Sequence, residues 1–411
     1  METKNNEETK KKQANLSGKL TPLDADDRLH HIDSLRGFAL LGILLVNMLA
    51  FQYGTIGYKF IYPTLLPIDK SAFSLIEWLF QGSFYPIFSM LFGFGAVIMW
   101  ERAEAKARPF NRIFIRRLLI LLVIGFMHLH FLWDGDILFT YAITGLLFIF
   151  FIKRKPKTLF IWALALMFLI NAPGLIPSGT EDTLDLTPYG DYEAELLAEG
   201  SYADIVHHRL TVNTFEKIDL GFAMDSLEHK IIASILAFFS FTTIVLQALM
   251  LFIFGALIAK KRWLHHIGEN KMFLKKTMII FLIAGLGLKG GMVLSENAML
   301  DYYGYLLGGP LAAVGYMAGF SLLFDRLGAT APFRGFAYLG RMALTNYLLQ
   351  SVIMTTIFYG YGVGMFGKLG PLTGSMMAAA LIGGQIFFSR YWLQRHRFGP
   401  MEWLWRKGTY L

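Results

Sequence analysis

Long apolar runs recur along this 411-residue chain, and each is close to the length needed to cross a lipid bilayer. Hydrophobic residues make up 55% of the chain and charged residues 17%, well below the charged share typical of soluble proteins. Ten spans are expected, at 37–53, 74–100, 117–133, 136–152, 158–174, 231–259, 273–294, 303–324, 336–360 and 371–392. The predicted fold is all-α, a polytopic helical membrane protein with about ten transmembrane helices.

The distribution of lysine and arginine predicts the orientation of these spans. With a cytoplasmic N-terminus, 30 of the 38 Lys and Arg residues lie in inner segments and 7 in outer segments, while Arg341 lies within a span. Because positive residues concentrate on the cytoplasmic side of membrane proteins, both termini are expected to be cytoplasmic. Contact with the lipid bilayer then accounts for the net charge of +8, and no nucleic-acid partner is expected.

The same patterns divide the chain into four regions. Residues 1–27 are polar and are expected to form a disordered cytoplasmic tail. Residues 28–174 and 231–411 form two membrane halves of about five spans each. Residues 175–230 carry twelve acidic residues and are expected to lie outside the cytoplasm as a lid over an outer cavity or, alternatively, as a solvated loop without a task. Helices are expected within this loop near 191–209 and 213–229.

Two polar residues interrupt the first span. Arg36 and Asn47 are eleven positions apart, so on an α-helix they point within about 20° of each other and lie about 16 Å apart along the axis. Because polar groups avoid hydrocarbon, this face is expected to look into the bundle or a wet cavity and to contact substrate. In the alternative interpretation, Asp33 and Arg36 form an ion pair that leaves the arginine no binding role.

The ninth span carries a second polar cluster. Asn346 and Gln350 are four positions apart and share a helix face, and Arg341 stands near the cytoplasmic start of the span. All three are candidate substrate-binding residues. For Arg341 two roles are equally compatible with the sequence, binding of a donor phosphate and extension of its guanidinium to the membrane interface.

The outer end of the third span carries the candidate catalytic groups. His128 and His130 point about 200° apart on a helix, so at most one of them faces the bundle. Asp134 and Asp136 follow in a tight turn, and a carboxylate beside an imidazole orients it and stabilises its charged form. His128 is the expected general base with Asp136 as its orienter, and His130 is the second candidate. The alternative is that all are ordinary polar residues at a helix end in contact with water.

Cysteine is absent, which excludes disulfides, thiolate metal ligands and a cysteine nucleophile. His207 and His208 are adjacent in the acidic loop, a spacing that suits a single metal ion poorly. Neither a metal site nor a tightly bound cofactor is expected.

Several motifs resemble the YeiB-like family of bacterial membrane proteins. They are IDSLRGFALLGILLVN at 32–47, FYPIFSMLFGFG at 84–95, HLHFLWDGDILFTYA at 128–142, GRMALTNYLLQ at 340–350 and RFGPMEWLWR at 397–406. The resemblance covers nearly the whole chain after the tail and makes 231–411 the family's C-terminal membrane domain. It implies a multi-pass protein of the bacterial cytoplasmic (inner or plasma) membrane, without a settled activity.

More distantly, the first span is similar to that of transmembrane acyltransferases, which transfer an acyl group from a cytoplasmic donor to acceptors such as sugars. In one branch of these enzymes a catalytic histidine stands eleven positions after the arginine of an Arg-Gly pair, where this chain has Asn47. In another branch asparagine stands there and the catalytic histidine comes from the following outer loop, whereas residues 54–72 of this chain contain no histidine. The similarity therefore implies a function without supplying its catalytic residue.

Two functions from different classes follow. The first is an acyltransferase that moves an acyl group from a cytoplasmic acyl thioester, such as acyl-CoA, to a small-molecule acceptor outside the cytoplasm. The alternative is a transporter or permease for a small solute. Transporters commonly place ionisable groups and broken helices at the bilayer midplane, whereas this chain keeps its charges near span ends, which favours the enzyme.

Overall fold

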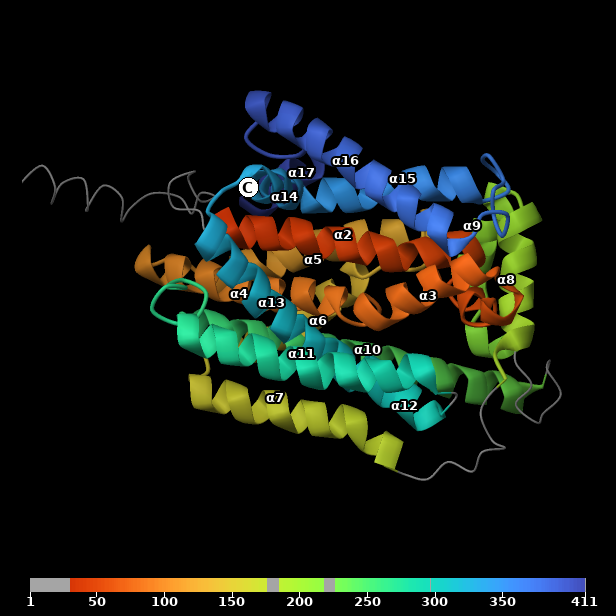
Figure 1. Cartoon of the computed structure of the whole chain (residues 1–411), viewed down its shortest axis with the longest axis horizontal. Helices are drawn as coiled ribbons and strands as arrows, with labels where there is room; N and C mark the ends of the chain where they lie inside the picture. Colours follow the sequence, from red (N-terminus) through yellow and green to blue (C-terminus); the bar gives the residue numbers. More distant parts are fainter. Residues whose placement is uncertain (1–29, 176–184, 218–225, 296, 411) are drawn as a thin grey trace, which may run out of the picture.

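Long helices run side by side through most of the molecule (Figure 1). The computed structural model describes residues 30–175, 185–217, 226–295 and 297–410, and the tail expected at 1–27 lies outside them. None of the described residues forms a strand. The chain is an all-α, multi-pass membrane protein, as the sequence predicted.

Seven helical segments of the described chain are long and apolar enough to cross a membrane. They are α2 (His30–Tyr53), α3 with α4 (Pro67–Leu79 and Phe84–Ala105), α5 (Phe110–Phe131), α10 (Leu227–Lys260), α11 (Lys271–Leu294), α12 to α13 (Ala298–Tyr303 and Gly309–Leu327, joined by a π-helical turn at Gly304–Gly308) and α16 (Pro371–Arg395). Three shorter apolar helices are α6 (Leu138–Ile152), α7 (Pro156–Asn171) and α15 (Ala343–Phe358). Together these segments overlap the ten expected spans, but the ninth, 336–360, is wrong as a single helix. A short helix, α14 (Ala331–Arg341), ends at Arg341, and α15 begins at Ala343. Another short helix, α17 (Pro400–Tyr410), follows α16.

The second expected span is broken between α3 and α4. Gly82 lies in this break with φ of +68°, a conformation that favours glycine. The backbone of α13 approaches it closely, because a Cβ added at Gly309 would lie 2.2 Å from the Gly82 carbonyl oxygen. The break therefore lets α13 pack against the chain where the helix changes direction.

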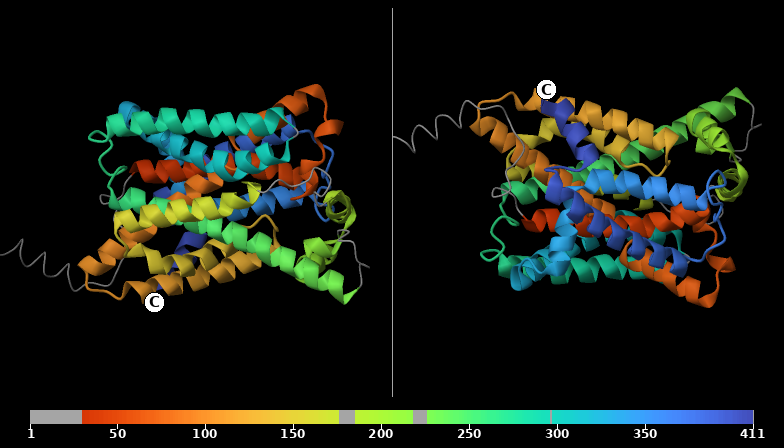
Figure 2. Two further views of the ribbon diagram at one scale, coloured as in Figure 1. Left: turned by 90° about the horizontal axis from the view of Figure 1, so that it is seen from below. Right: turned by 90° about the horizontal axis from the view of Figure 1, so that it is seen from above.

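The two ends of the bundle differ. The start of α2 and the C-terminus lie at one end, called here the terminal end (Figure 1). Two helices, α8 (Thr187–Glu199) and α9 (Tyr202–Thr211), form what is called here the cap and lie at the opposite end, the cap end (Figures 1 and 2). Under the expected orientation the terminal end is cytoplasmic.

The cap differs in detail from the sequence prediction. The helix expected at 191–209 is two helices, and the second begins at a capping box in which Ser201 and Asp204 exchange side-chain and backbone hydrogen bonds. The helix expected at 213–229 is wrong as a single element, because 214–217 form a 3-10 turn and α10 begins at Leu227. Residues 218–225 lie outside the described chain.

Helices α2 and α14 cross at very short range. A Cβ on Gly37 would lie 2.0 Å from the Phe336 carbonyl oxygen, and a Cβ on Gly340 would lie 2.0 Å from the Asp33 carbonyl oxygen. Small residues that let backbones touch are typical of helix contacts in membranes. Arg36 precedes Gly37 and Arg341 follows Gly340, so the crossing brings these two arginines into the same region of the bundle.

Candidate active site

The last turn of α5 presents His128 to the interior of the bundle. The residue is 2% exposed, and Nδ1 lies 2.7 Å from a carboxylate oxygen of Asp136. On the other side of the ring, Nε2 lies 2.8 Å from the hydroxyl oxygen of Ser351, on α15. Three side chains from two separate parts of the chain thus form the continuous hydrogen-bonded series Asp136–His128–Ser351, called here the buried triad.

The turn after α5 explains how Asp136 reaches the imidazole. The backbone N–H groups of Leu132 and Trp133 donate to the His128 carbonyl, which ends the helix, and α6 starts at Leu138. The second oxygen of Asp136 accepts the N–H of Phe139 at 2.6 Å, and so satisfies a donor at the start of α6. One carboxylate therefore both caps a helix and orients the histidine.

His130 points elsewhere. Its Nδ1 lies 3.0 Å from the backbone carbonyl oxygen of Arg209 in the cap, and its ring packs on Phe126. The two histidines therefore separate as expected, with His128 in the bundle and His130 against the cap.

Sequence reasoning missed Ser351. A lone serine in an apolar helix carries little signal, because such residues commonly bond the carbonyl of the preceding turn. The spacing of hydroxyl-bearing residues was the one signal in the sequence. Tyr347, Ser351 and Thr355 recur every four residues and form a polar stripe beside that of Asn346 and Gln350. Only the structure shows which of the two stripes faces His128.

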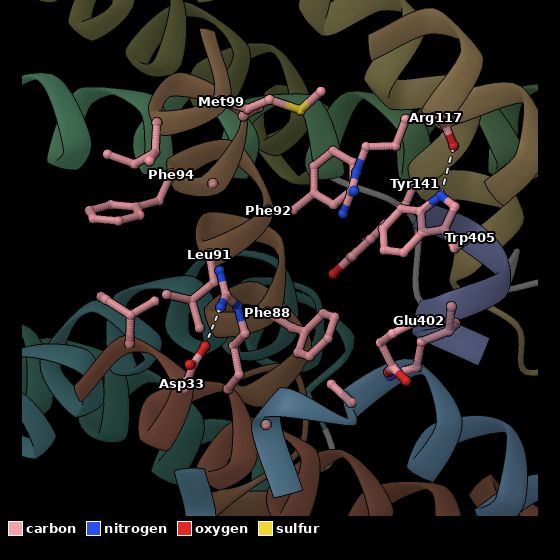
Figure 3. Close-up of a pocket in the computed structure, with 18 of the residues that line it drawn as sticks. Asp33, Phe88, Leu91, Phe92, Phe94, Met99, Arg117, Tyr141, Glu402 and Trp405 are labelled. Carbon is pink, nitrogen blue, oxygen red and sulfur yellow. Dashed lines mark hydrogen bonds and ion pairs between the residues drawn. The ribbon is translucent and has the colours of Figure 1, made fainter. Parts of the chain in front are cut away.

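A cavity of about 540 Å³ begins near the terminal end and is lined as far as Tyr347 and the start of α6. Figure 3 shows part of this lining. The α2 wall of the cavity includes Asp33, Arg36, Leu40 and Ile43, and the far part of the cavity is lined by residues at the start of α6 and by Tyr347. The ring of Tyr347 also packs on His128, with 5.1 Å between ring centroids. Tyr347 thus contacts both the cavity and the imidazole.

Arginines gather around the terminal part of this cavity. The lining includes Arg36, Arg102, Arg117, Arg262, Arg341 and Arg406. Three carboxylates accompany them, and all three are engaged. Asp33 pairs with Arg36 at 2.7 Å and Glu101 with Arg262 at 2.8 Å. Glu402 accepts the N–H of Leu344 and both the N–H and hydroxyl of Thr345 at the start of α15. The cavity entrance is therefore positively charged.

Three of these arginines differ in the contacts that their side chains make. The guanidinium of Arg117 lies 3.6 Å from the ring centre of Trp405, and the indole N–H of Trp405 donates to the Arg117 carbonyl (Figure 3). Arg341 keeps a buried Nε–H that has no acceptor among the described residues. The pair Asp33–Arg36 forms as the alternative interpretation expected, yet Arg36 still lines the cavity.

Asn47 continues the α2 face beyond the cavity. It follows Ile43, which lines the cavity, and precedes Phe51, which packs on Trp133 with 4.3 Å between ring centroids. Asn47 is not a lining residue and is partly exposed. It lies along the helix between the cavity and the turn that holds Asp136.

Asn346 and Gln350 face α16 rather than the cavity. Asn346 donates to Ser389 at 2.9 Å, Gln350 donates to Gln385 at 2.8 Å, and Gln385 donates to the Asn346 carbonyl at 2.9 Å. None of these four side chains lines the cavity. They form an interhelical network, called here the amide network.

Charged side chains join the cap to residues 55–57 and to the turn after α5. Glu193 accepts hydrogen bonds from the backbone N–H groups of Thr55, Ile56 and Gly57 and from the Thr55 hydroxyl. Burial, followed by the charge of Asp134, raises the pKa of Glu193. Asp134 in turn pairs with Arg209 at 3.1 Å. Among the described residues, no group of three or more His, Asp or Glu side chains is arranged to hold a metal ion.

Relatives of the chain are found among bacterial proteins. Residues 258–411 match a family described as a protein of unknown function, DUF418. The Bacillus subtilis (strain 168) protein YxaH is 34% identical over 403 residues, covering 95% of this chain and 96% of the relative. The Escherichia coli (strain K12) protein YeiB is 28% identical over 390 residues, covering 92% and 95%. The chain belongs to the YeiB-like family. Both relatives are named as uncharacterized proteins, so the family brings no activity with it.

Proposed function

We propose that the chain is a transmembrane acyltransferase that takes an acyl group from a cytoplasmic acyl thioester and delivers it to an acceptor on the other side of the membrane. The observation that carries this proposal is that an arginine-lined cavity leads to Tyr347, which packs on a buried histidine held by a carboxylate. An imidazole oriented in this way acts as a general base when the acceptor attacks a thioester.

The cavity suits a donor with a phosphorylated head and an apolar tail. Guanidinium groups bind phosphates through two N–H donors at once, and arginines surround the entrance. Farther in, the lining becomes apolar and aromatic, with Leu40, Phe88 and Phe92 among its members. Coenzyme A thioesters have this combination of groups.

Thiol release provides a direct test. Because the chain contains no cysteine, free coenzyme A can be followed with a thiol reagent without background from the protein. We expect the purified protein to release thiol from acetyl-CoA in the presence of an amino sugar such as glucosamine, and His128→Ala to abolish this release. Equal release by wild type and His128→Ala, or no stabilisation of the wild type by acetyl-CoA in thermal unfolding, would contradict the proposal.

The orientation belongs to the same proposal, in which the protein lies in the bacterial cytoplasmic membrane with both termini inside. Single cysteines at the exposed positions Lys59 and Lys368 should react with an impermeant thiol reagent added to intact cells, whereas cysteines at Ala105 and Gly268 should not. The inverse labelling pattern would place the cavity entrance on the wrong side for a cytoplasmic donor.

One observation favours the alternative function, transport. Lys289 on α11 is completely buried and donates to the hydroxyl of Ser83 at 2.9 Å, and a buried carboxylate oxygen of the nearby Glu77 has no partner among the described residues. Ionisable groups inside membrane helices often lie on transport pathways. Lys289→Met should leave thiol release unchanged if the chain is the proposed enzyme.

A further inference from the structure

Ser351 has an unusual hydrogen bond for a serine in an apolar helix. Such serines normally donate to the carbonyl four residues earlier, as Ser321 does at 2.7 Å and Ser375 at 2.8 Å. The corresponding distance from Ser351 to the Tyr347 carbonyl is 3.5 Å, whereas the distance to Nε2 of His128 is 2.8 Å. The hydroxyl is therefore directed toward the imidazole.

The direction of proton donation follows from the chemistry of the ring. A neutral imidazole carries one N–H, and the carboxylate of Asp136, 2.7 Å from Nδ1, can only accept it. Nε2 is then the acceptor, so the Ser351 hydroxyl donates to it. Nucleophile, base and orienting carboxylate stand in this order in enzymes that form acyl-serine intermediates.

We propose that Ser351 is a nucleophile that carries the acyl group covalently between donor and acceptor. This inference rests on the proposed acyltransferase function and adds a step to it. The Ser351 oxygen attacks the thioester carbonyl while its proton passes to Nε2 of His128. The C–S bond then breaks, and the departing thiolate takes the proton from the imidazolium. The products are a free thiol and an ester on Ser351.

The second half of the reaction regenerates the free hydroxyl of Ser351. A hydroxyl or amine of the acceptor attacks the ester carbonyl and gives its proton to His128. The bond from the carbonyl carbon to the Ser351 oxygen breaks, and the proton returns to that oxygen. No oxidant or additional reactant is required, and the histidine acts as base and then acid in each half.

Two neighbouring side chains support a reaction at this position. Trp133 is 1% exposed, packs against His128 with 6.4 Å between ring centroids, and keeps an indole N–H without an acceptor among the described residues. A buried donor without a partner is costly, and an acyl oxygen at the triad would supply an acceptor. Tyr347, one turn before Ser351, lies between the cavity and the imidazole, so its side chain is placed to admit the donor.

A covalent carrier also fits the geometry of the bundle. The cavity runs from the terminal end as far as Tyr347, which packs on His128, while the turn at Asp136 lies toward the cap end. With the acyl group on Ser351, the donor and the acceptor need not occupy the site together. In this proposal the donor needs to reach Ser351 only from the terminal end, and the acceptor only from the cap end.

The test is acyl transfer to the protein itself. The purified full-length chain is incubated with isotope-labelled acetyl-CoA without acceptor, quenched in acid and analysed by intact-protein and peptide mass spectrometry. We expect one acetyl group per chain on the peptide containing Ser351, and transfer to glucosamine on a chase. Ser351→Ala should lose this label and reduce turnover by roughly 10² or more. Thr355→Val, one turn later on the same helix, is the matched control and should keep both.

A cysteine variant gives an independent readout. Ser351→Cys introduces the only thiol in the chain, and its acetyl thioester should be released by neutral hydroxylamine, whereas the wild-type ester should resist it. Turnover that depends on His128 but is unchanged in Ser351→Ala would overturn the covalent step and leave the acyltransferase proposal intact. If the wild-type protein does not turn over acetyl-CoA at all, both the acyltransferase proposal and the covalent step are contradicted. A label on the wild type that persists in Ser351→Ala would place the acyl group on another residue and also overturn the inference.

Discussion

Helix α15 contributes to two buried polar networks that differ in chemistry. Toward α16, Asn346 and Gln350 join Ser389 and Gln385 in the amide network, whose members are neutral at all ordinary pH values. Toward α5, Ser351 joins the buried triad, which contains the ionisable side chains of His128 and Asp136. None of the amide-network side chains lines the cavity, whereas the triad contacts the lining residue Tyr347. Polar groups on adjacent faces of one helix thus serve helix packing on one side and, in our proposal, chemistry on the other.

The largest difference between the networks should appear on removal of His128. His128→Ala should lower acyl-CoA turnover by roughly 10² or more, because the proton of the attacking group then has no acceptor in the site. Donor binding, followed by thermal stabilisation with acetyl-CoA, should stay near that of the wild type. His130→Ala is the matched control, since this ring contacts the cap carbonyl of Arg209, and its turnover should change little. A reduction of similar size in both variants would argue for a shared structural role.

Asn47→Leu tests the α2 face between the cavity and the triad. Leucine suits a membrane helix, so expression and thermal unfolding should be nearly unchanged while turnover falls by about tenfold or more. If instead the protein unfolds at lower temperature, Asn47 belongs with the amide network as a contact between helices.

Arg341→Gln should separate binding from chemistry. Arg341 lines the cavity, and its buried Nε–H has no partner among the described residues. Loss of the guanidinium should therefore raise the KM for acetyl-CoA by about tenfold with kcat preserved. Arg334→Gln, an exposed arginine on the same helix α14, is the control and should leave KM unchanged. Equal effects of the two substitutions would mean that general positive charge, rather than the cavity, attracts the donor.

The smallest effect on turnover is expected from the amide network. Gln350→Leu removes one interhelical hydrogen bond, which in membrane helices contributes about 0.5–2 kcal/mol to the free energy of unfolding. The melting temperature should fall while kcat of the folded protein stays within about twofold of wild type. A large loss of kcat without loss of stability would move Gln350 into the active site and erase the distinction between the two networks.

The helical bundle could be predicted from the sequence more fully than the site. Membrane spans follow from long apolar runs, and the orientation of His128 and Asp136 followed from helix geometry and a short turn. The partners of polar residues could not be predicted in this way, because a side chain such as Gln350 meets whichever neighbouring helix the tertiary packing brings to it. Ser351 could not be predicted for the same reason, since its partner His128 is 223 residues away in sequence. The split of the expected helix 191–209 has a local sequence signal, because Ser201 and Asp204 form a capping box at the start of α9.

Transfer of an acyl group across the membrane can be measured in proteoliposomes in which each side of the protein is supplied separately. Vesicles whose orientation has been fixed by labelling of a cysteine at Lys368 receive labelled acetyl-CoA on the terminal side and glucosamine on the cap side. We expect free thiol on the terminal side and acetylated sugar on the cap side, and we expect both to be absent in His128→Ala. Acetylated sugar formed only when donor and acceptor share one side, or no acetylated sugar at all while glucosamine itself crosses the membrane, would contradict this transfer.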